Sequence, residues 1–184
     1  MNGINVTITD MMNCRDRRVS IQNELINKYD KPVLSFCMNI PGPVKTNEQI
    51  RKAFDSGKAE LLKALSAHNI AIFHTEEFHE PSGDELIMAL DAPAEDIKTL
   101  ATEIEESHPL GRLFDMDVIG TDGMKLSRGT YRKCIICGCQ AQECARSRRH
   151  SVEELQIKIE ELLNQFLFNP GSYYKQTSKA PSHI

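Results

Sequence analysis

The stretch His108–Val118 reads HPLGRLFDMDV and closes the fold that the sequence predicts. From Leu113 onward it is rich in residues that favour β-strands. Asp115 and Asp117 are two positions apart, so on a strand both would point to the same face of the sheet. Two like charges on one face repel each other, and a divalent cation or a group of Arg and Lys side chains would offset that repulsion. Two interpretations stay open here, namely an edge strand with a solvated acidic face and a metal site.

The composition is typical of a soluble globular protein. The chain has 184 residues, of which 40% are hydrophobic and 26% charged, which suffices for one domain with a buried core. Its first ten residues, MNGINVTITD, lack the features of a secretory signal, and no apolar run is long enough to cross a membrane. We therefore expect a cytoplasmic protein whose six cysteines are thiols or metal ligands. The net charge of −4 argues against a general nucleic-acid-binding protein.

The hydrophobic pattern predicts a first helix followed by the order β-α-β-β-α-β. The expected helices cover 10–30 and 47–68 and a segment that begins at Pro93, and the expected strands cover 33–40, 70–75, 85–90 and the Asp-x-Asp stretch. This is the order of the ferredoxin-like split βαβ fold, an α+β fold with two helices on one face of a four-stranded antiparallel sheet. The expected core face of the first helix is Met12, Val19, Leu25, Ile26 and Tyr29, and Gly57 is expected to weaken the second helix.

The predicted topology makes the first and last strands antiparallel neighbours. It therefore places the end of the first strand, with Pro41, Gly42 and Lys45, beside the start of the last, with His108, Gly111 and Arg112. Backbone N–H groups near a glycine, together with cationic side chains, suit the binding of a phosphate group. We therefore expect a phosphate-binding corner at this edge of the sheet.

Cysteines gather in the segment 132–150. The pair Cys134-x2-Cys137, with Cys144 and His150 behind it, supplies four ligands of the kind that Zn²⁺ prefers, and Cys139 is a competing thiol. The alternative is a set of small buried thiols near a turn.

A capping box at Ser151-x-x-Glu154 then begins a helix over 152–168. We expect a single domain over 1–168 that includes the Cys-rich segment and this helix, and a flexible tail over 169–184.

Arginines form short clusters beside turns. They are Arg15 and Arg18, Arg112, Arg128 and Arg132, and Arg146, Arg148 and Arg149. Scattered arginines are ordinarily a solvated surface, but a multiply phosphorylated ligand would use several planar guanidinium groups. The last cluster would equally suit an acidic protein partner.

With these residues collected, the chain resembles the holo-citrate lyase synthases, also called apo-citrate lyase phosphoribosyl-dephospho-CoA transferases. The resemblance rests on blocks that follow one another along nearly the whole domain. They are Arg15-Asp16-x-Arg18, Pro41-Gly42-Pro43-x-Lys45, Arg51, Ser107–Val118, Leu126-Ser127-Arg128, Arg132-x-Cys134-x-x-Cys137, and Cys144-Ala145-Arg146 with His150.

The resemblance implies an enzyme of the nucleotidyltransferase type. Such enzymes take 2′-(5″-triphosphoribosyl)-3′-dephospho-CoA and transfer its phosphoribosyl-dephospho-CoA part to a serine of the apo acyl carrier subunit of citrate lyase, with release of pyrophosphate. The nucleophile then belongs to the partner, which agrees with the lack of a nucleophile-elbow serine in this chain. The alternative from a different class is a non-enzymatic binding module stabilised by zinc.

Roles for single residues follow as hypotheses. By analogy with nucleotidyltransferases that use Asp-x-Asp, Asp115 and Asp117 would hold Mg²⁺, and one of them or His108 would accept the serine proton. Arg112 would act beside them in the catalytic group. The expected phosphate-binding residues are Arg15, Arg18, Gly42, Lys45, Arg51, Arg128 and Arg132, and the expected zinc ligands are Cys134, Cys137, Cys144 and His150.

Overall fold

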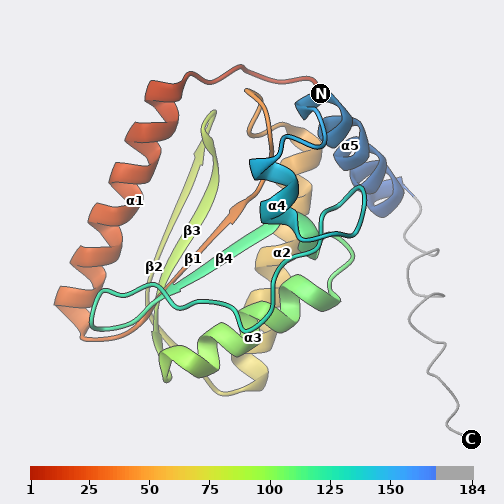
Figure 1. Ribbon diagram of the computed structural model, residues 1–184. Helices are drawn as coiled ribbons and strands as arrows, with labels where there is room; N and C mark the ends of the chain where they lie inside the picture. Colours follow the sequence, from red (N-terminus) through yellow and green to blue (C-terminus); the bar gives the residue numbers. More distant parts are fainter. Residues whose placement is uncertain (169–184) are drawn as a thin grey trace, which may run out of the picture.

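The computed structural model describes residues 1–168 as an α+β structure built on a four-stranded antiparallel sheet (Figure 1). Its elements are α1 (Ile8–Tyr29), β1 (Val33–Met38), α2 (Glu48–Ala67), β2 (Ala71–Glu80), β3 (Gly83–Asp91), α3 (Ala94–Ser107), the 3-10 helix η1 (Gly111–Leu113), β4 (Phe114–Ile119), α4 (Ala141–Arg146) and α5 (Val152–Phe168). The tail predicted over 169–184 lies outside the described residues. Within the described part, no helix is long and apolar enough to cross a membrane.

The strand order in the sheet is β2-β3-β1-β4. The first and last strands are therefore antiparallel neighbours, as the sequence predicted, with Phe36 opposite Met116 and Cys37 opposite Asp115. Side chains alternate between the two faces of a strand, so β4 presents Met116 to one face and Asp115 with Asp117 to the other.

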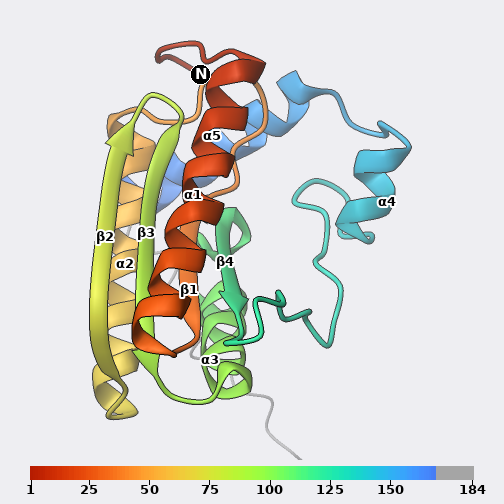
Figure 2. The same ribbon diagram turned by 90° about the vertical axis from the view of Figure 1, so that its left-hand side faces the viewer.

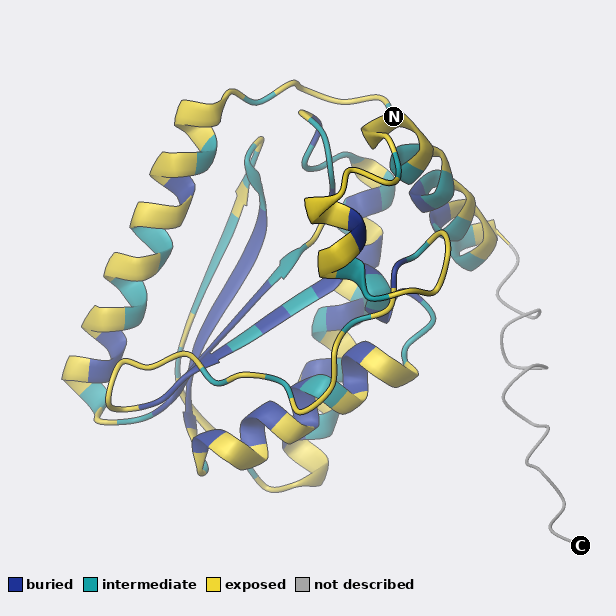
Figure 3. Ribbon diagram, in the orientation of Figure 1, coloured by how far each residue is buried: buried dark blue, intermediate teal, exposed yellow. Residues whose placement is uncertain are grey.

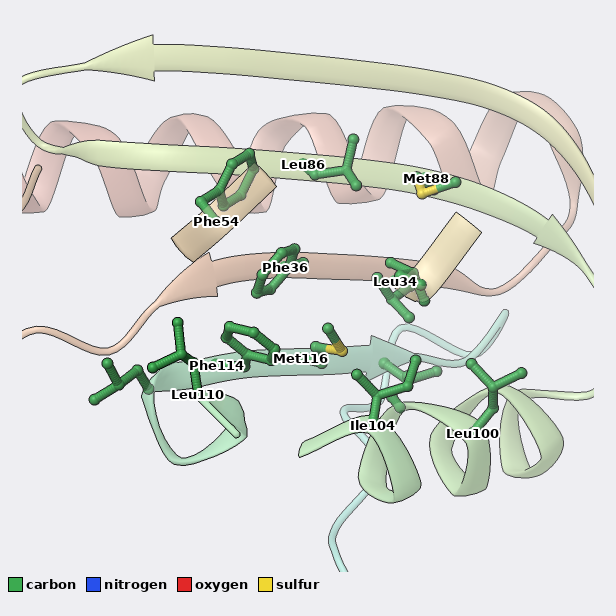
Figure 4. Packing of buried hydrophobic residues seen from close by; sticks show 14 of the residues in the cluster. Leu34, Phe36, Phe54, Leu86, Met88, Leu100, Ile104, Leu110, Phe114 and Met116 are labelled. Carbon is green, nitrogen blue, oxygen red and sulfur yellow. The ribbon is translucent and has the colours of Figure 1, made fainter. Parts of the chain in front are cut away.

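The two faces of the sheet differ in what covers them. Figure 2 shows α1 on one face and α2 on the other, and the segment from residue 120 to α4 beyond the edge of β4. The main core lies between the sheet and the helices α2, α3 and α5 (Figures 3 and 4). At its centre the ring of Phe36 stacks on Phe54 at 4.9 Å between centroids and meets Phe114 edge-on at 5.3 Å.

Helix α1 packs through a different stripe from the predicted one. Met12 and Val19 are 58% and 53% exposed, so their placement in the core was wrong, whereas Leu25 and Ile26 are buried. The cause lies in the opposite surface, because the sheet face under the first half of α1 is polar. A helix on that surface turns Cys14 inward, rather than its larger apolar side chains.

Gly57 is a point of close packing in α2 rather than a weak one. A Cβ atom at this position would stand 2.7 Å from Cζ of Phe36 and 2.8 Å from Cζ of Phe114. The missing side chain lets the two rings approach the helix, so glycine's low helix propensity is offset by aromatic packing.

Two elements were misjudged from the sequence. Strand β2 runs over Ala71–Glu80 and is longer than the predicted 70–75. It is an edge strand with mostly exposed or half-buried residues, so it lacks the apolar alternation that marks a half-buried strand. Helix α4, over Ala141–Arg146, was not expected because so short a segment carries almost no periodic signal.

Candidate functional site

Side chains, rather than a further strand, cover most of the outer edge of β4. The carboxylate of Glu105 accepts a hydrogen bond from the N–H of Met116 at 2.8 Å. The ammonium of Lys98 donates to the carbonyl of Met116 at 2.9 Å, and Nη2 of Arg132 donates to the carbonyl of Phe114 at 2.7 Å. Three of the edge groups of β4 are therefore satisfied by charged side chains, and the carbonyl of Val118 accepts from the backbone N–H of Leu126. This arrangement places a concentration of charge beside the strand that carries the two aspartates.

Glu105 is the centre of this charged group. It is 4% exposed and pairs with Arg132 and with Nη2 of Arg128 at 3.2 Å. Burial raises the pKa of the Glu105 carboxyl, and the Arg132 guanidinium opposes that shift. Arg128 also lies 3.5 Å from Glu106, so Glu105 is the buried member of a network of acidic and guanidinium groups.

A cavity of about 700 Å³ lies beside this edge. Its lining includes Asp115 and Asp117 from β4 and the loop 125–132, together with part of α4. Nζ of Lys125 lies 2.6 Å from Oδ2 of Asp117, and Nη1 of Arg132 lies 3.8 Å from Oδ1 of Asp115. The repulsion between the two carboxylates is thus offset within the chain by a lysine and an arginine.

The same sheet face continues from β4 onto β1 and β3. Cys37 lies opposite Asp115 on one side and opposite Glu85 on the other. Burial raises the pKa of the Cys37 thiol to about 12, although the Arg18 guanidinium opposes the shift. Burial also lowers the pKa of the Lys45 ammonium, which the neighbouring Cys37 opposes. A thiol with so high a pKa stays protonated at neutral pH and does not act as a nucleophile.

Two arginines of α1 converge on Glu85, which is 2% exposed. Nε of Arg18 donates to Oε1 of Glu85 at 2.5 Å, and Nη2 of Arg17 lies 3.1 Å from Oε2. Arg15, by contrast, is exposed. The structure therefore brings Arg18 to the polar sheet face and leaves Arg15 outside it.

Arg112 stands apart from the other predicted phosphate ligands. Its Nε atom is shielded from solvent and has no hydrogen-bond partner among the described residues. Burial, followed by the charges of Arg132 and Arg128, lowers the pKa of the Arg112 guanidinium. It lines a cavity of about 620 Å³ with these two arginines and another of about 510 Å³ with Asn39 and the Cys-rich segment. A half-buried guanidinium with an unpartnered Nε–H favours an anionic ligand.

The predicted corner at the end of β1 is only partly assembled. Pro41 lines the same cavity as Arg112, of about 510 Å³. Gly42 lies under α5, because a Cβ atom there would stand 2.3 Å from Nε2 of Gln156. Nζ of Lys45 donates to the carbonyl of Ile40 at 2.7 Å. Helix α5, whose position the sequence did not reveal, fills the space beside Gly42.

The structure does not bring His108 to the aspartates. Its ring contacts Phe114, which belongs to the core face of β4, whereas Asp115 points to the opposite face. Nδ1 of His108 accepts a hydrogen bond from the N–H of Leu110 at 3.1 Å, and Nε2 lies 3.1 Å from Oγ of Ser56. Burial lowers the pKa of the ring. The surroundings describe a neutral histidine that organises the turn before η1.

Arg51 also lies in other surroundings. Its Nη2 atom is 2.5 Å from Oδ1 of Asp84, a fully buried carboxylate at the β2–β3 hairpin. Thr46 and His79 also contact that carboxylate. Arg51 therefore balances a buried charge at the hairpin.

The predicted Cys/His ligands form one group in space. The potential ligand atoms of four residues lie within 4.8 Å of one another, and these residues are Cys134, Cys137, Cys144 and His150. Cys139 is not among them, and its Sγ atom lies 3.5 Å from Nη1 of Arg149. The nearby His150 ring, and then the backbone at Cys139, lower the pKa of the Cys137 thiol to about 5. Of the two candidates for the third thiol ligand, Cys144 and Cys139, only Cys144 lies in the group.

Sequence reasoning missed two buried carboxylates, Glu105 and Glu85. Glu105 is seven residues after Lys98 in α3, and this spacing places both side chains on one face of the helix, beside its apolar stripe. Glu85 alternates with Ile87 and Ala89 along β3, so the period of two places it on the α1 face. Both signals were present, but neither carboxylate lies in a recognisable motif.

Comparison with known proteins identifies the same family as the sequence blocks did. The family described as apo-citrate lyase phosphoribosyl-dephospho-CoA transferase matches residues 6–166. Proteins with this name from Citrobacter koseri, Escherichia coli O1:K1 and Shigella boydii are each 35% identical to the chain over 163 residues, which cover 86% of this chain and 89% of the relative. The chain therefore belongs to the apo-citrate lyase phosphoribosyl-dephospho-CoA transferase family.

Proposed function

We propose that this protein attaches the prosthetic group of citrate lyase. It transfers the phosphoribosyl-dephospho-CoA group from 2′-(5″-triphosphoribosyl)-3′-dephospho-CoA to a serine of the apo acyl carrier subunit and releases pyrophosphate. The observation that carries this proposal is the family match over residues 6–166, together with relatives that bear the transferase name. The alternative of a non-enzymatic binding module has no comparable support.

The proposed reaction is a displacement at phosphorus. The serine oxygen of the carrier forms a bond to the innermost phosphorus of the triphosphate, and the bond from that phosphorus to the pyrophosphate oxygen breaks. Such reactions depend on positioning and charge stabilisation more than on covalent chemistry by the enzyme. The high pKa of Cys37 is compatible with a nucleophile that comes from the partner.

Asp115 and Asp117 are proposed to hold Mg²⁺ together with the triphosphate. They lie on one face of β4 and line the cavity of about 700 Å³. Mg²⁺ in phosphoryl-transfer sites commonly has one or two carboxylate ligands, and substrate phosphates and water supply the rest. When bound, the ion would neutralise charge on the triphosphate and on the leaving pyrophosphate. Lys125 would have to leave Asp117 for this site to form.

The surroundings of the predicted phosphate-binding residues divide them into two groups. Arg112, Arg128 and Arg132 line adjoining cavities and are proposed to bind the phosphates directly. The polar sheet face would be the second contact region for the donor. Its proposed residues are Arg18 and Lys45.

Asp115 is proposed as the group that accepts the serine proton. It is 40% exposed at the cavity, and its nearest cation, Arg132, is 3.8 Å away. Both ring nitrogens of His108 already have partners on the other face of the sheet, which weighs against His108 in that role.

We also propose that residues 1–168 form one transferase domain with a ferredoxin-like core. The strand order β2-β3-β1-β4 and the packing of α2 and α3 against the same core support this reading. Ile159 and Leu163 of α5 belong to that core too, which ties the C-terminal helix to the sheet.

Mass spectrometry of the carrier subunit tests the proposed function. The apo carrier is incubated with this protein, the triphosphoribosyl precursor and Mg²⁺. The expected result is a carrier heavier by one phosphoribosyl-dephospho-CoA group, with an equimolar yield of pyrophosphate. A carrier of unchanged mass, under conditions in which a relative of this family modifies it, would overturn the proposal.

The metal role of the aspartates is tested separately. Asp117→Asn is expected to shift the Mg²⁺ dependence of transfer to higher concentration and to lower the maximal rate. Asp55→Asn removes an exposed carboxylate on α2 and is expected to match the wild type. If the two variants have the same Mg²⁺ titration curve, Asp117 is not a metal ligand.

A further inference from the structure

The Cys-rich segment has the geometry of a metal site. The loop 134–139 is a tight turn in which the N–H of Cys134 donates to the carbonyl of Cys139 at 2.6 Å. The N–H of Gly138 donates back to the carbonyl of Cys134 at 3.0 Å. Gly138 has φ of +73°, a conformation that favours glycine. This turn places the thiols of Cys134 and Cys137 side by side.

The other two side chains reach the turn from α4 and from the segment that follows it. Cys144 is in α4, and its Sγ atom lies 3.4 Å from Sγ of Cys137. Sulfur atoms around a tetrahedral zinc ion stand about 3.8 Å apart, whereas a disulfide bond is about 2.05 Å long. The backbone N–H of Arg149 donates to the carbonyl of Cys144 at 3.0 Å, which fixes the chain just before His150.

Burial of the group also suits a metal. Cys134 and Cys144 are 8% and 6% exposed, and Nε2 of His150 is shielded without a hydrogen-bond partner among the described residues. A shielded polar nitrogen without a partner destabilises a fold, and coordination by that nitrogen would remove the cost.

We propose that Cys134, Cys137, Cys144 and His150 bind one Zn²⁺ ion as a structural centre. Three thiolates and one imidazole make a closed set of four ligands, with no position left for water, as in structural rather than catalytic zinc sites. The proposal does not depend on the transfer reaction.

The centre would brace one wall of a cavity that Arg112 also lines. Cys134, Cys144 and His150 line the cavity of about 510 Å³ that also contains Arg112. A zinc ion at this point would link the loop 134–139 to α4 and to the segment just before α5. We therefore infer that the zinc ion fixes the position of the Cys-rich segment relative to η1, which carries Arg112.

Metal content of the full chain tests the proposal without any substrate. The protein is produced with zinc in the medium, desalted, and analysed by elemental mass spectrometry. The wild type is expected to contain equimolar zinc. Cys137→Ser removes a ligand that is exposed, so its packing cost is small, and it is expected to lose most of the zinc. Cys139→Ser changes a neighbouring exposed thiol outside the group and is expected to keep it.

Two further measurements guard against variants that fail to fold. His150→Cys supplies another zinc ligand and is expected to retain the metal, whereas His150→Ala is expected to lose it. Wild-type protein refilled with Co²⁺ is expected to show the absorption bands of tetrahedral cobalt bound to thiolates. Wild-type protein without zinc and without this cobalt spectrum would overturn the proposal, and so would equal zinc content in Cys137→Ser and Cys139→Ser.

Discussion

Arg112 differs from its neighbouring arginines in having no carboxylate partner among the described residues. Arg128 and Arg132 both pair with Glu105, and Arg18 pairs with Glu85. A guanidinium whose charge is not already balanced gains most from a bound phosphate. At the scale of single residues, Arg112 is therefore the strongest candidate for binding the donor.

Arg112→Ala is expected to raise the KM for the triphosphoribosyl donor by about 10- to 100-fold, because a charge-assisted hydrogen bond contributes about 1.5–3 kcal/mol. Arg112→Lys keeps the charge but loses the planar fork, and an intermediate loss is expected. Steady-state kinetics with a saturating carrier measure both. Arg146→Ala, at an exposed position, is the control. A KM for Arg112→Ala that equals the control would remove Arg112 from the donor site.

His108 is expected to make the fold sensitive to acid. Burial lowers the pKa of its ring, so the unfolded chain binds the proton first as the pH falls. Stability is therefore expected to decrease from about pH 6.5 downward through the lowered pKa, and to be independent of this group above that range. Urea unfolding at pH 5 and pH 7.5 measures the effect. In His108→Asn the difference between the two midpoints should shrink, and an unchanged difference would assign the acid sensitivity to other groups.

At the scale of elements, the packing of α2 against the sheet depends on the absence of a side chain at Gly57. In Gly57→Ala the clash with Phe36 and Phe114 is expected to cost about 1–3 kcal/mol, more than the roughly 1 kcal/mol that alanine contributes to a helix. Thermal or urea denaturation is expected to show a lower stability. Gly129→Ala is the matched control, because nothing lies within 4 Å of its Cβ position. A more stable Gly57→Ala variant would mean that the two rings move aside freely.

The cover on the β4 edge depends on one carboxylate. Glu105→Gln keeps an acceptor for the N–H of Met116 but removes the buried counter-charge of Arg128 and Arg132. These arginines keep only more distant and more exposed carboxylates, Glu106 at 3.5 Å and Asp115 at 3.8 Å. We expect a loss of about 3–5 kcal/mol in the free energy of unfolding. Glu103→Gln, on the exposed side of α3, should stay within about 0.5 kcal/mol of the wild type. Denaturant titrations of both variants decide whether Glu105 balances this edge.

The elements with a repeating pattern were predictable and the pairings between distant residues were not. The pairing of the first and last strands followed from the order of elements, and the four-residue Cys/His group followed from ligand type and close spacing. The partners of Asp117 and Arg132 could not be predicted, because Lys125 and Glu105 reach them from a loop and a helix whose orientation no local pattern encodes. The exposure of Met12 had the same cause, since the face of a helix that is buried depends on the surface opposite it.

At the scale of the whole molecule, the segment from residue 120 to α4 lies beyond the β4 edge, while the sheet and its covering helices form the core (Figure 2). This arrangement predicts two levels of local stability. If the Cys/His group binds zinc, chelation of the metal is expected to speed hydrogen exchange in 132–150 and to leave β1 and β3 protected. Exchange followed by mass spectrometry, with and without chelator, measures this. A uniform loss of protection would instead mean that the segment and the sheet unfold together.

The side-chain cover on β4 also bears on how copies of the protein meet one another. A strand edge with open N–H and C=O groups is a template for pairing with another chain, and here Glu105, Lys98 and Arg132 occupy those groups. The residues that shape the candidate cavity are thus also expected to keep this edge from pairing with another chain. Substitutions that uncover this edge should therefore lower the yield of monodisperse protein, and that loss has to be separated from any loss of turnover.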